Sequence, residues 1–217
     1  MKRVIALLTF LFIISCSKSN GPDKMYFDGK EICLDSSKVE LLSSVKTGIS
    51  GLDKSSEMLK VTYRSGDPLF DLFVGQWRVP EGNINYLSYS LMKLTESEID
   101  KYRSHKMIKD AFNRTGSFEG ATPEDMKPGF VKIRRRMETY AWQVFKSPVN
   151  SDVNAFDLWV GDCIKYSNSL KCSFFYIHEN YLIEVDLAEN FLLEKPRVIK
   201  EVELDIKNNL FCESRIK

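Results

Sequence analysis

The sequence predicts an α+β fold, in which an antiparallel β-sheet carries helices on one face. The first observation is a series of strand-like apolar runs after Gly129, parted by short turn segments. These runs cover residues 130–137, 139–146, 155–166, 170–178 and 181–187. Strands with such short links must be antiparallel neighbours, because a parallel crossover needs a dozen residues or more. The second half of the chain is therefore expected to form a β-meander.

The second observation is helical spacing at the end of the chain. Pro196 suits the first turn of a helix, where its missing N–H has no partner to lose. The apolar residues that follow at intervals of three or four are Ile199, Val202, Ile206 and Leu210. The chain is thus expected to close with an amphipathic helix that ends near Cys212 and packs on the sheet.

The fold is expected to begin near Met25 with a small hairpin. Asp28-Gly29 is a dipeptide favoured in tight hairpin turns, because both central residues need positive φ. Apolar residues flank it at 25–27 and at 32–34. These runs are the two expected strands.

A helix is predicted over residues 38–47. Ser37 and Glu40 have the spacing of a capping box, and apolar residues follow at helical spacing. Gly48 stands where a helix C-terminus favours a left-handed residue.

Strands are expected again between residues 59 and 94. The apolar residues there are mostly β-branched or aromatic, and they often alternate with polar ones, as Phe70, Leu72 and Val74 do.

A second helix and a long loop are expected to follow. Thr95 and Glu98 form another capping box, ahead of a partly helical pattern that Gly116 ends. Residues 116–129 are rich in Gly and Pro, which is typical of a loop.

The first sixteen residues have the features of an export signal. Lys2 and Arg3 precede an apolar run at 4–14, which is too short to span a bilayer as a helix. A small residue, Ser15, then stands before Cys16, where a processing enzyme would cut. The chain divides into a signal peptide at 1–15, an anchor and tether at 16–24, and a single domain at 25–217.

The segment Ile13-Ile14-Ser15-Cys16 resembles the lipobox of bacterial lipoproteins. The resemblance implies that residues 1–15 are removed and that Cys16 becomes the first residue, whose acyl chains hold the protein on a membrane. Because Ser17 rather than Asp follows Cys16, the resemblance further implies the outer membrane of a Gram-negative cell, with the domain in the periplasm. Residues 17–24 lack apolar side chains and are expected to form a flexible tether.

The remaining cysteines are expected to form two disulfides. Cys16 is one of five cysteines, so four remain once it is acylated, and an even number in an exported chain indicates disulfides. If Ser167-Asn168 is a hairpin turn, Cys163 and Cys172 lie directly opposite each other. Cys33 and Cys212 are then expected to pair by elimination.

The charge balance argues against nucleic acid as a partner. The full chain has a formal net charge of +1, and loss of Lys2 and Arg3 with the signal changes it to −1. A nucleic-acid binder needs a basic excess to displace counterions, which a balanced chain lacks.

The sequence contains none of the strong catalytic, nucleotide or zinc motifs, and no cofactor or metal site is predicted. Ser43 begins an S-x-x-K match, but a K-T-G match starts at its Lys46, and these two motifs must face each other from different elements. His105 and His178 are the two histidines. His178 is expected to flank a hairpin turn, because the second histidine of a metalloprotease helix is missing.

The candidate contact surface is a basic and aromatic stripe on neighbouring strands. Lys132, Arg134 and Arg136 alternate along one strand, so they should project from the same face, with Tyr140 and Trp142 on the next. Arg and aromatic residues are common binding anchors, and an acidic patch is expected on the partner. The alternative interpretation is a solvated sheet face with Trp142 in the core, which is commoner in antiparallel sheets.

Three functions are compatible with these features. A non-catalytic protein-binding module is favoured, for which periplasmic immunity proteins that neutralise a toxin are an analogy. An accessory subunit of an envelope transport or assembly complex would use the same surface. An envelope hydrolase acting through dispersed carboxylates such as Asp157, Asp162 and Glu184 is the third and least favoured.

Overall fold

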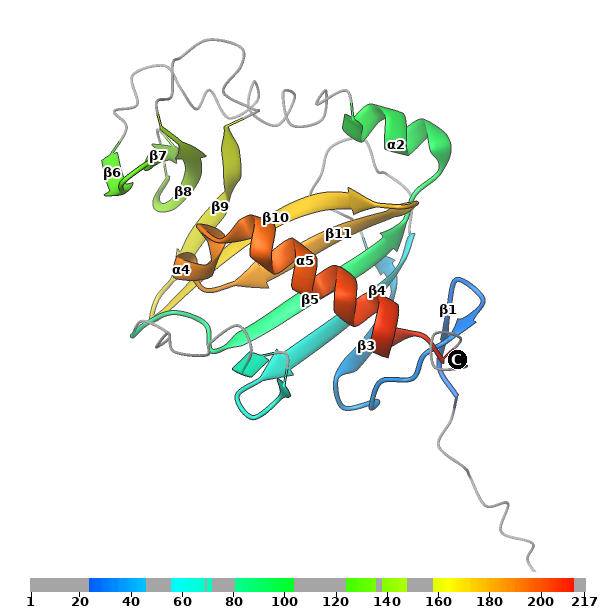
Figure 1. Ribbon diagram of the computed structural model, residues 1–217. Coiled ribbons are helices and arrows are strands. Elements are labelled where there is room, and N and C mark those ends of the chain that lie inside the picture. The colour runs from blue at the N-terminus through cyan, green and yellow to red at the C-terminus, as the bar shows by residue number, and fades with distance from the viewer. Residues whose placement is uncertain are drawn as a thin grey trace, which may run out of the picture.

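The computed structural model describes residues 24–45, 56–68, 70–71, 81–103, 124–135, 138–147 and 158–212. They form a nine-stranded antiparallel sheet in the order β3-β4-β5-β11-β10-β9-β8-β7-β6, and a separate hairpin, β1-β2 (Figure 1). The strands are β1 (Tyr26–Phe27), β2 (Lys30–Glu31), β3 (Val39–Val45), β4 (Ser56–Arg64), β5 (Tyr86–Lys93), β6 (Glu124–Lys127), β7 (Phe130–Arg135), β8 (Glu138–Lys146), β9 (Trp159–Tyr166), β10 (Ser169–His178) and β11 (Tyr181–Leu187). The helices are α2 (Glu96–Arg103), α4 (Glu189–Leu192), α5 (Lys195–Asp205) and the π-helical turn η2 (Ile206–Leu210).

The meander after Gly129 is confirmed. Strands β7 to β11 follow one another in sequence and pair with their neighbours in the sheet, all antiparallel. Tight turns make this possible, and residues in them have positive φ: Ser167 at 34° and Glu179 at 54°. His178 flanks the second of these turns, as expected, and pairs with Tyr181 across it.

The N-terminal hairpin is also confirmed. Asp28 and Gly29 both have positive φ, of 50° and 76°, as a two-residue hairpin turn requires. The hairpin is joined to the end of the chain, because Ile32 forms a bridge with Phe211 and the Cys33 N–H donates to the Leu210 carbonyl at 2.8 Å.

The predicted helix over 38–47 is wrong, because residues Val39–Val45 form strand β3. The Ser37 N–H donates to the Asp35 side chain at 2.8 Å, so it takes part in a turn before the strand rather than capping a helix. Val39 then pairs with Val61 of β4 and is buried. Pairing with the free edge of β4 therefore outweighs the local capping signal. Residues 46 and 47 lie outside the described part of the chain.

The region 59–94 contains two of the expected strands, β4 and β5, but Phe70 is not in a strand. Pro68, Phe70 and Asp71 are helical, and the Asp71 N–H donates to the Asp67 carbonyl at 2.9 Å. Proline at the start of this turn favours helical φ, which explains why the alternating pattern misleads. Leu72 and Val74 lie outside the described residues.

The second capping box is confirmed, since both the N–H and the hydroxyl of Thr95 donate to Glu98 Oε2 at 2.7 Å ahead of α2. The described part of this helix ends at Arg103.

The loop predicted over 116–129 is wrong for its last part, because Glu124–Lys127 form β6. Gly129 has a φ of 88°, so Pro128-Gly129 acts as a hairpin turn between β6 and β7.

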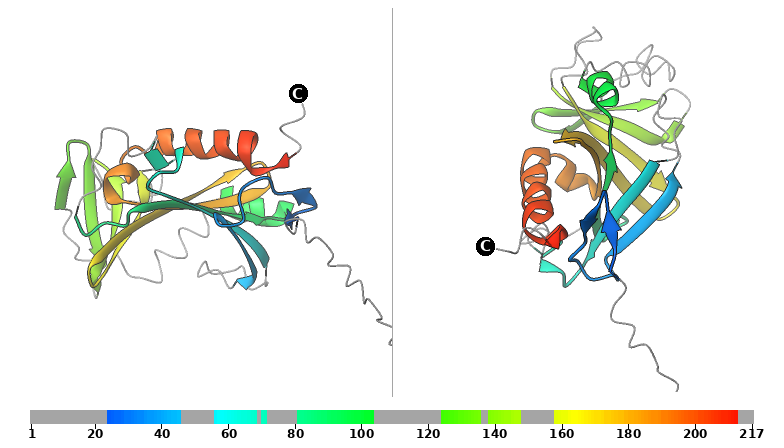
Figure 2. Two further views of the ribbon diagram at one scale, coloured as in Figure 1. Left: turned by 90° about the horizontal axis from the view of Figure 1, so that it is seen from below. Right: turned by 90° about the vertical axis from the view of Figure 1, so that its right-hand side faces the viewer.

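The helices lie on both faces of the sheet rather than on one. Figure 2 shows α4 and α5 along one face, where Val198 and Val202 of α5 are buried in the main core. Ile99 of α2 instead packs against a smaller cluster with Met92 and Leu182. These two side chains alternate along their strands with those of the main core, so they point to the opposite face.

The predicted C-terminal helix is present, and it is fastened to the sheet by one buried carboxylate. Asp205 is 3% exposed, and its Oδ2 accepts hydrogen bonds from the hydroxyls of Tyr63 on β4 and Tyr89 on β5, both at 2.6 Å. Asn209 donates to Oδ1 at 2.8 Å. The π-helical turn begins directly after Asp205, so the carboxylate is held where the helix geometry changes.

Candidate functional site

The structure brings together most of the predicted basic and aromatic stripe. Lys132 and Arg134 project from the same face of β7, and Arg134 pairs in register with Trp142 of β8. The Lys132 Nζ lies 5.9 Å and the Arg134 Cζ lies 5.5 Å from the centroid of the Trp142 ring. Arg136 lies outside the described residues.

Trp142 forms the base of this stripe rather than its surface. The side chain is 8% exposed, and its Nε1–H donates to Glu189 of α4 at 3.2 Å. The core interpretation that the sequence left open is thus the better description of Trp142. Tyr140, on the same strand, is 51% exposed and is available to a partner.

The two cations of the stripe share one carboxylate. Glu124 of β6 accepts from the Arg134 Nε–H at 2.9 Å and lies 3.1 Å from the Lys132 Nζ. The hydrogen bonds from Arg134 and Lys132 lower the pKa of the Glu124 carboxyl below its usual value. The stripe therefore keeps one positive charge in excess, with Arg134 held in place between a carboxylate and an indole ring.

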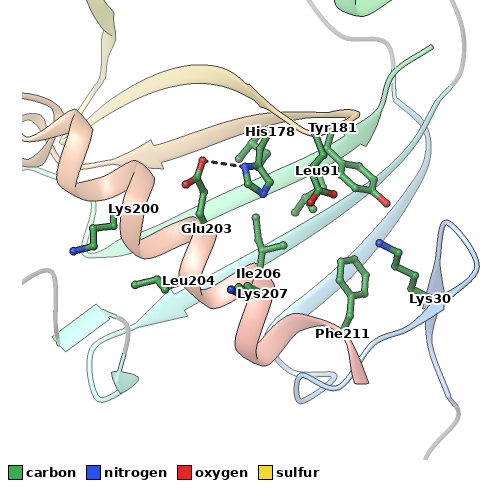
Figure 3. Close-up of a pocket in the computed structure, with 12 residues that line it drawn as sticks. Lys30, Leu91, His178, Tyr181, Lys200, Glu203, Leu204, Ile206, Lys207 and Phe211 are labelled. Carbon is green, nitrogen blue, oxygen red and sulfur yellow. Dashed lines mark ion pairs between the residues drawn. The ribbon is translucent and has the colours of Figure 1, made fainter. Parts of the chain in front are cut away.

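A second candidate site is a cavity of about 570 Å³ between α5–η2, the β10–β11 hairpin and the β1–β2 hairpin (Figure 3). We call it the C-terminal groove. The residues that line it include Lys30, Tyr181, Lys200, Leu204, Lys207 and Phe211. Lys30 reaches over the groove from β2, with its Nζ at 5.1 Å from the Phe211 ring centroid and 5.8 Å from that of Tyr181.

A contact between a histidine and a carboxylate crosses the C-terminal groove from the sheet to the helix. His178 Nδ1 lies 3.0 Å from Glu203 Oε1, as the dashed line in Figure 3 marks. Sequence analysis missed this site, because its residues come from β2, β10, β11 and α5–η2. The spacing of Lys200, Leu204 and Lys207 is a signal that could have been noticed, whereas nothing local connects them with Lys30.

Both expected disulfides are present, and the pairing is the one predicted. Cys163 and Cys172 are directly opposite on β9 and β10, with Cα atoms 4.0 Å apart. Cys33 and Cys212 join the segment after β2 to the end of η2 across a sequence separation of 179. Cys212 directly follows Phe211, which lines the C-terminal groove.

A half-buried lysine that the sequence did not indicate is the first residue of α5. The Lys195 Nζ donates to the Val160 carbonyl at 3.0 Å and lies 4.6 Å from the Trp159 ring centroid and 5.0 Å from that of Phe174. Burial lowers the pKa of this amine to about 8, with a smaller contribution from Lys146. The amine therefore loses its charge at a lower pH than an exposed lysine does, although it is still mostly protonated at neutral pH.

The carboxylates considered for hydrolysis lie partly together. Asp162 and Glu184 are on the sheet face opposite α5, and Asp186 lies near both. Desolvation and then the Asp186 carboxylate raise the pKa of Glu184. The third residue, Asp157, lies outside the described part of the chain, as does His105.

Two features are absent from the described residues. No group of three or more His, Cys, Asp or Glu side chains among them is placed to hold a metal ion. None of the helices formed by those residues is long and apolar enough to cross a bilayer. Ser43, the serine of the S-x-x-K match, lies in strand β3 rather than on a helix.

Comparison with known proteins gives no relative, because no protein-family model, no curated protein and no solved structure matches this chain.

Proposed function

We propose that this chain is a lipoprotein of the bacterial cell envelope, anchored through Cys16 in the outer membrane, whose periplasmic domain is a non-catalytic protein-binding module. The anchor is supported by the lipobox resemblance of Ile13-Ile14-Ser15-Cys16. The two disulfides support an oxidising compartment. The proposal includes an amphipathic α5, with Val198 and Val202 facing the sheet and Leu204 facing solvent.

One observation carries the binding function: Arg134 is held over Trp142, and the exposed Tyr140 lies on the strand beside it. Binding orders side chains at a cost of about 0.5–1.5 kcal/mol each, so an arginine that is already ordered loses less. Arg and Tyr are also the residue types that most often dominate binding energy. We name Arg134 and Tyr140 the contact pair.

The positive charge left over on the stripe decides what kind of partner group fits. Glu124 is exposed and holds Arg134 and Lys132 in the free protein. An acidic residue of the partner would approach the same cations from outside and share or replace Glu124. The expected partner surface is therefore acidic, as in a toxin domain neutralised by an immunity protein. A resident subunit of an envelope complex is the alternative partner.

The test is a pull-down with a tagged chain that begins at Ser17, followed by rate measurements on any partner retained. This chain keeps residues 24–212, which make all the described contacts. Arg134→Glu is expected to slow association about tenfold, and Tyr140→Ala to speed dissociation by a similar factor.

Arg197→Glu and Tyr166→Ala are the matched controls, because these exposed residues lie on α5 and at the end of β9. They should leave both rates unchanged. Unchanged kinetics in folded Arg134→Glu and Tyr140→Ala, or equal losses in the controls, would contradict the contact pair. Retention of no partner by the wild-type chain, from an extract that contains envelope complexes and a cognate toxin, would contradict the binding function.

A further inference from the structure

The outer side of α5–η2 carries an apolar residue between two lysines. Lys200, Leu204 and Lys207 are spaced by four and three residues, so they share one face of the helix. Leu204 is 41% exposed, which makes it one of the few large apolar side chains in the described residues that face solvent. Figure 3 shows these residues in succession along the helix, with Lys30 reaching toward Phe211 and Tyr181 from the other side.

The lysines of the C-terminal groove differ from several other lysines of the described residues, which pair with a carboxylate. Within the described residues, Lys38 pairs with Asp67, Lys93 with Asp28, and Lys171 with Asp186. No ion pair in that part of the chain involves Lys30, Lys200 or Lys207.

Three carboxylates lie near these lysines. One is Asp28, which pairs with Lys93, accepts a hydrogen bond from the Tyr181 hydroxyl and interacts electrostatically with Lys30. Glu203 is paired with His178, and Glu179 lies in the turn at the rim. Lys30, Lys93, Lys200 and Lys207 against these three groups leave one positive charge in excess, so an anion is the complementary ligand.

The position of the groove relative to the proposed anchor suggests the source of that anion. Lys30 belongs to the first hairpin, only six residues after Lys24, where the described chain begins. Between Cys16 and Lys24 the chain can extend at most about 3.3–3.6 Å per residue, which keeps this end of the domain within about 30 Å of the acylated cysteine. Figures 1 and 2 place β1 and the end of η2 together, at the end of the domain opposite β6–β8.

We propose that the C-terminal groove binds the phosphate headgroup of an anionic phospholipid in the membrane that carries the Cys16 anchor. The inference rests on the proposed anchor. Lys30 at one end of the groove and Lys200 and Lys207 along the helix attract the anionic headgroups, and Leu204 enters the interface between headgroups and acyl chains. This contact seats the domain with the β1 end toward the bilayer and the contact pair, Arg134 and Tyr140, toward the periplasm.

The experiment measures binding of the chain from Ser17, which has no acyl group, to phosphatidylcholine vesicles with and without phosphatidylglycerol. Binding is expected only to the anionic vesicles and is expected to weaken with salt. The triple variant Lys30→Gln/Lys200→Gln/Lys207→Gln should bind roughly 100-fold more weakly, since each lysine near an anionic surface is worth about fivefold. Leu204→Ser should lower binding several-fold at unchanged charge.

The matched control replaces the same number of lysines at the opposite end: Lys127→Gln/Lys146→Gln/Lys165→Gln. It changes the net charge equally and should lose little binding. Near-UV circular dichroism and intact disulfides establish that each variant is folded. Glycerol phosphate in solution separates a headgroup in a bilayer from a free phosphate ligand.

The proposal is overturned if the wild-type chain ignores anionic vesicles, if both triple variants lose binding equally, or if dissolved glycerol phosphate binds the groove as well as vesicles do. Because the protein in this measurement carries no lipid, absence of acylation at Cys16 in cells would contradict the proposed anchor and leave the vesicle result intact. The two failures are therefore distinguishable.

Discussion

Lys195 is a half-buried lysine whose amine has aromatic rings around it and a carbonyl as its hydrogen-bond partner. Because burial lowers its folded pKa to about 8, against 10.5 for the free side chain, the unfolded chain binds more protons between these two values. The contribution of Lys195 to the free energy of unfolding therefore rises with pH across this window, and its penalty is fully present below about pH 8. The lysine destabilises the fold near neutral pH.

Lys195→Met is expected to remove this pH dependence. The difference in unfolding free energy, variant minus wild type, should fall by roughly 3 kcal/mol as pH rises from below 8 to above 10.5. Urea unfolding at a series of pH values measures it. Lys165→Met, at an exposed lysine on β9, should give a difference that does not change with pH. A flat difference for Lys195→Met as well would show that its amine is not desolvated.

The sequence pattern predicted the neighbours of Trp142 in part, and it did not predict the position of Lys30. The alternation of Lys132, Arg134 and Trp142 on adjoining strands was enough to predict that they lie together. It did not predict that Glu124 and Glu189 come from β6 and α4 to pair with them. Lys30 gave no signal, because its role depends on a helix 170 residues later in the sequence.

At the scale of elements, the strands with short turns between them were predicted well, and the segments that depend on distant partners were not. Strand β3 has the capping signal of a helix, yet its pairing partner is β4, beyond a gap of ten residues outside the described part. Strand β6 similarly needs β7 to pair with. Local propensity is a weak term of under about 1 kcal/mol per residue, so a vacant sheet edge overrides it.

The two disulfides act on elements in different ways. Cys163–Cys172 joins neighbouring strands across a separation of 9, whereas Cys33–Cys212 joins the first hairpin to the last helix across a separation of 179. In the chain-entropy account a longer loop gives more stabilisation, about 5 kcal/mol for the long loop and about 3 kcal/mol for the short one. The bond at the end of η2 is thus expected to stabilise more.

Two variants that each keep one disulfide test this expectation. Within each variant the oxidised and reduced forms have the same sequence, so the comparison measures the loss of one bond. Cys163→Ala/Cys172→Ala keeps the long loop, and Cys33→Ala/Cys212→Ala keeps the short one. The loss of unfolding free energy on reduction should be larger by about 2 kcal/mol in the first variant. Equal losses, or a larger loss for the short loop, would contradict the expectation.

At the scale of the whole molecule, the domain has two different ends. The first hairpin and the end of η2 meet at one, and β6–β8 with the contact pair form the other (Figure 1). A tether that leaves from Lys24 would hold the first end near the bilayer and present the second to partners. Anchor, C-terminal groove and contact pair are consistent with a single orientation.

The anchor itself gives the prediction at this scale. Cys16→Ser should abolish incorporation of a fatty-acid label and leave an uncleaved precursor, because the sulfur that receives the lipid is missing. Ser17→Ala is the control and should be labelled as wild type, since the position after the cysteine is not acylated. Labelled Cys16→Ser protein would rule out this residue as the anchor.

The sequence by itself determined the meander, the first hairpin, the C-terminal helix and the disulfide pairing. These features depend on turn residues, on apolar periodicity and on register between adjacent strands, which are all written over short stretches of chain. Tertiary structure alone decided that β3 is a strand, that α2 packs on the opposite face, that Trp142 is buried, and that Lys30 meets Lys207 around one groove. Each of these depends on which distant surface is available to pack against, and no local pattern encodes that.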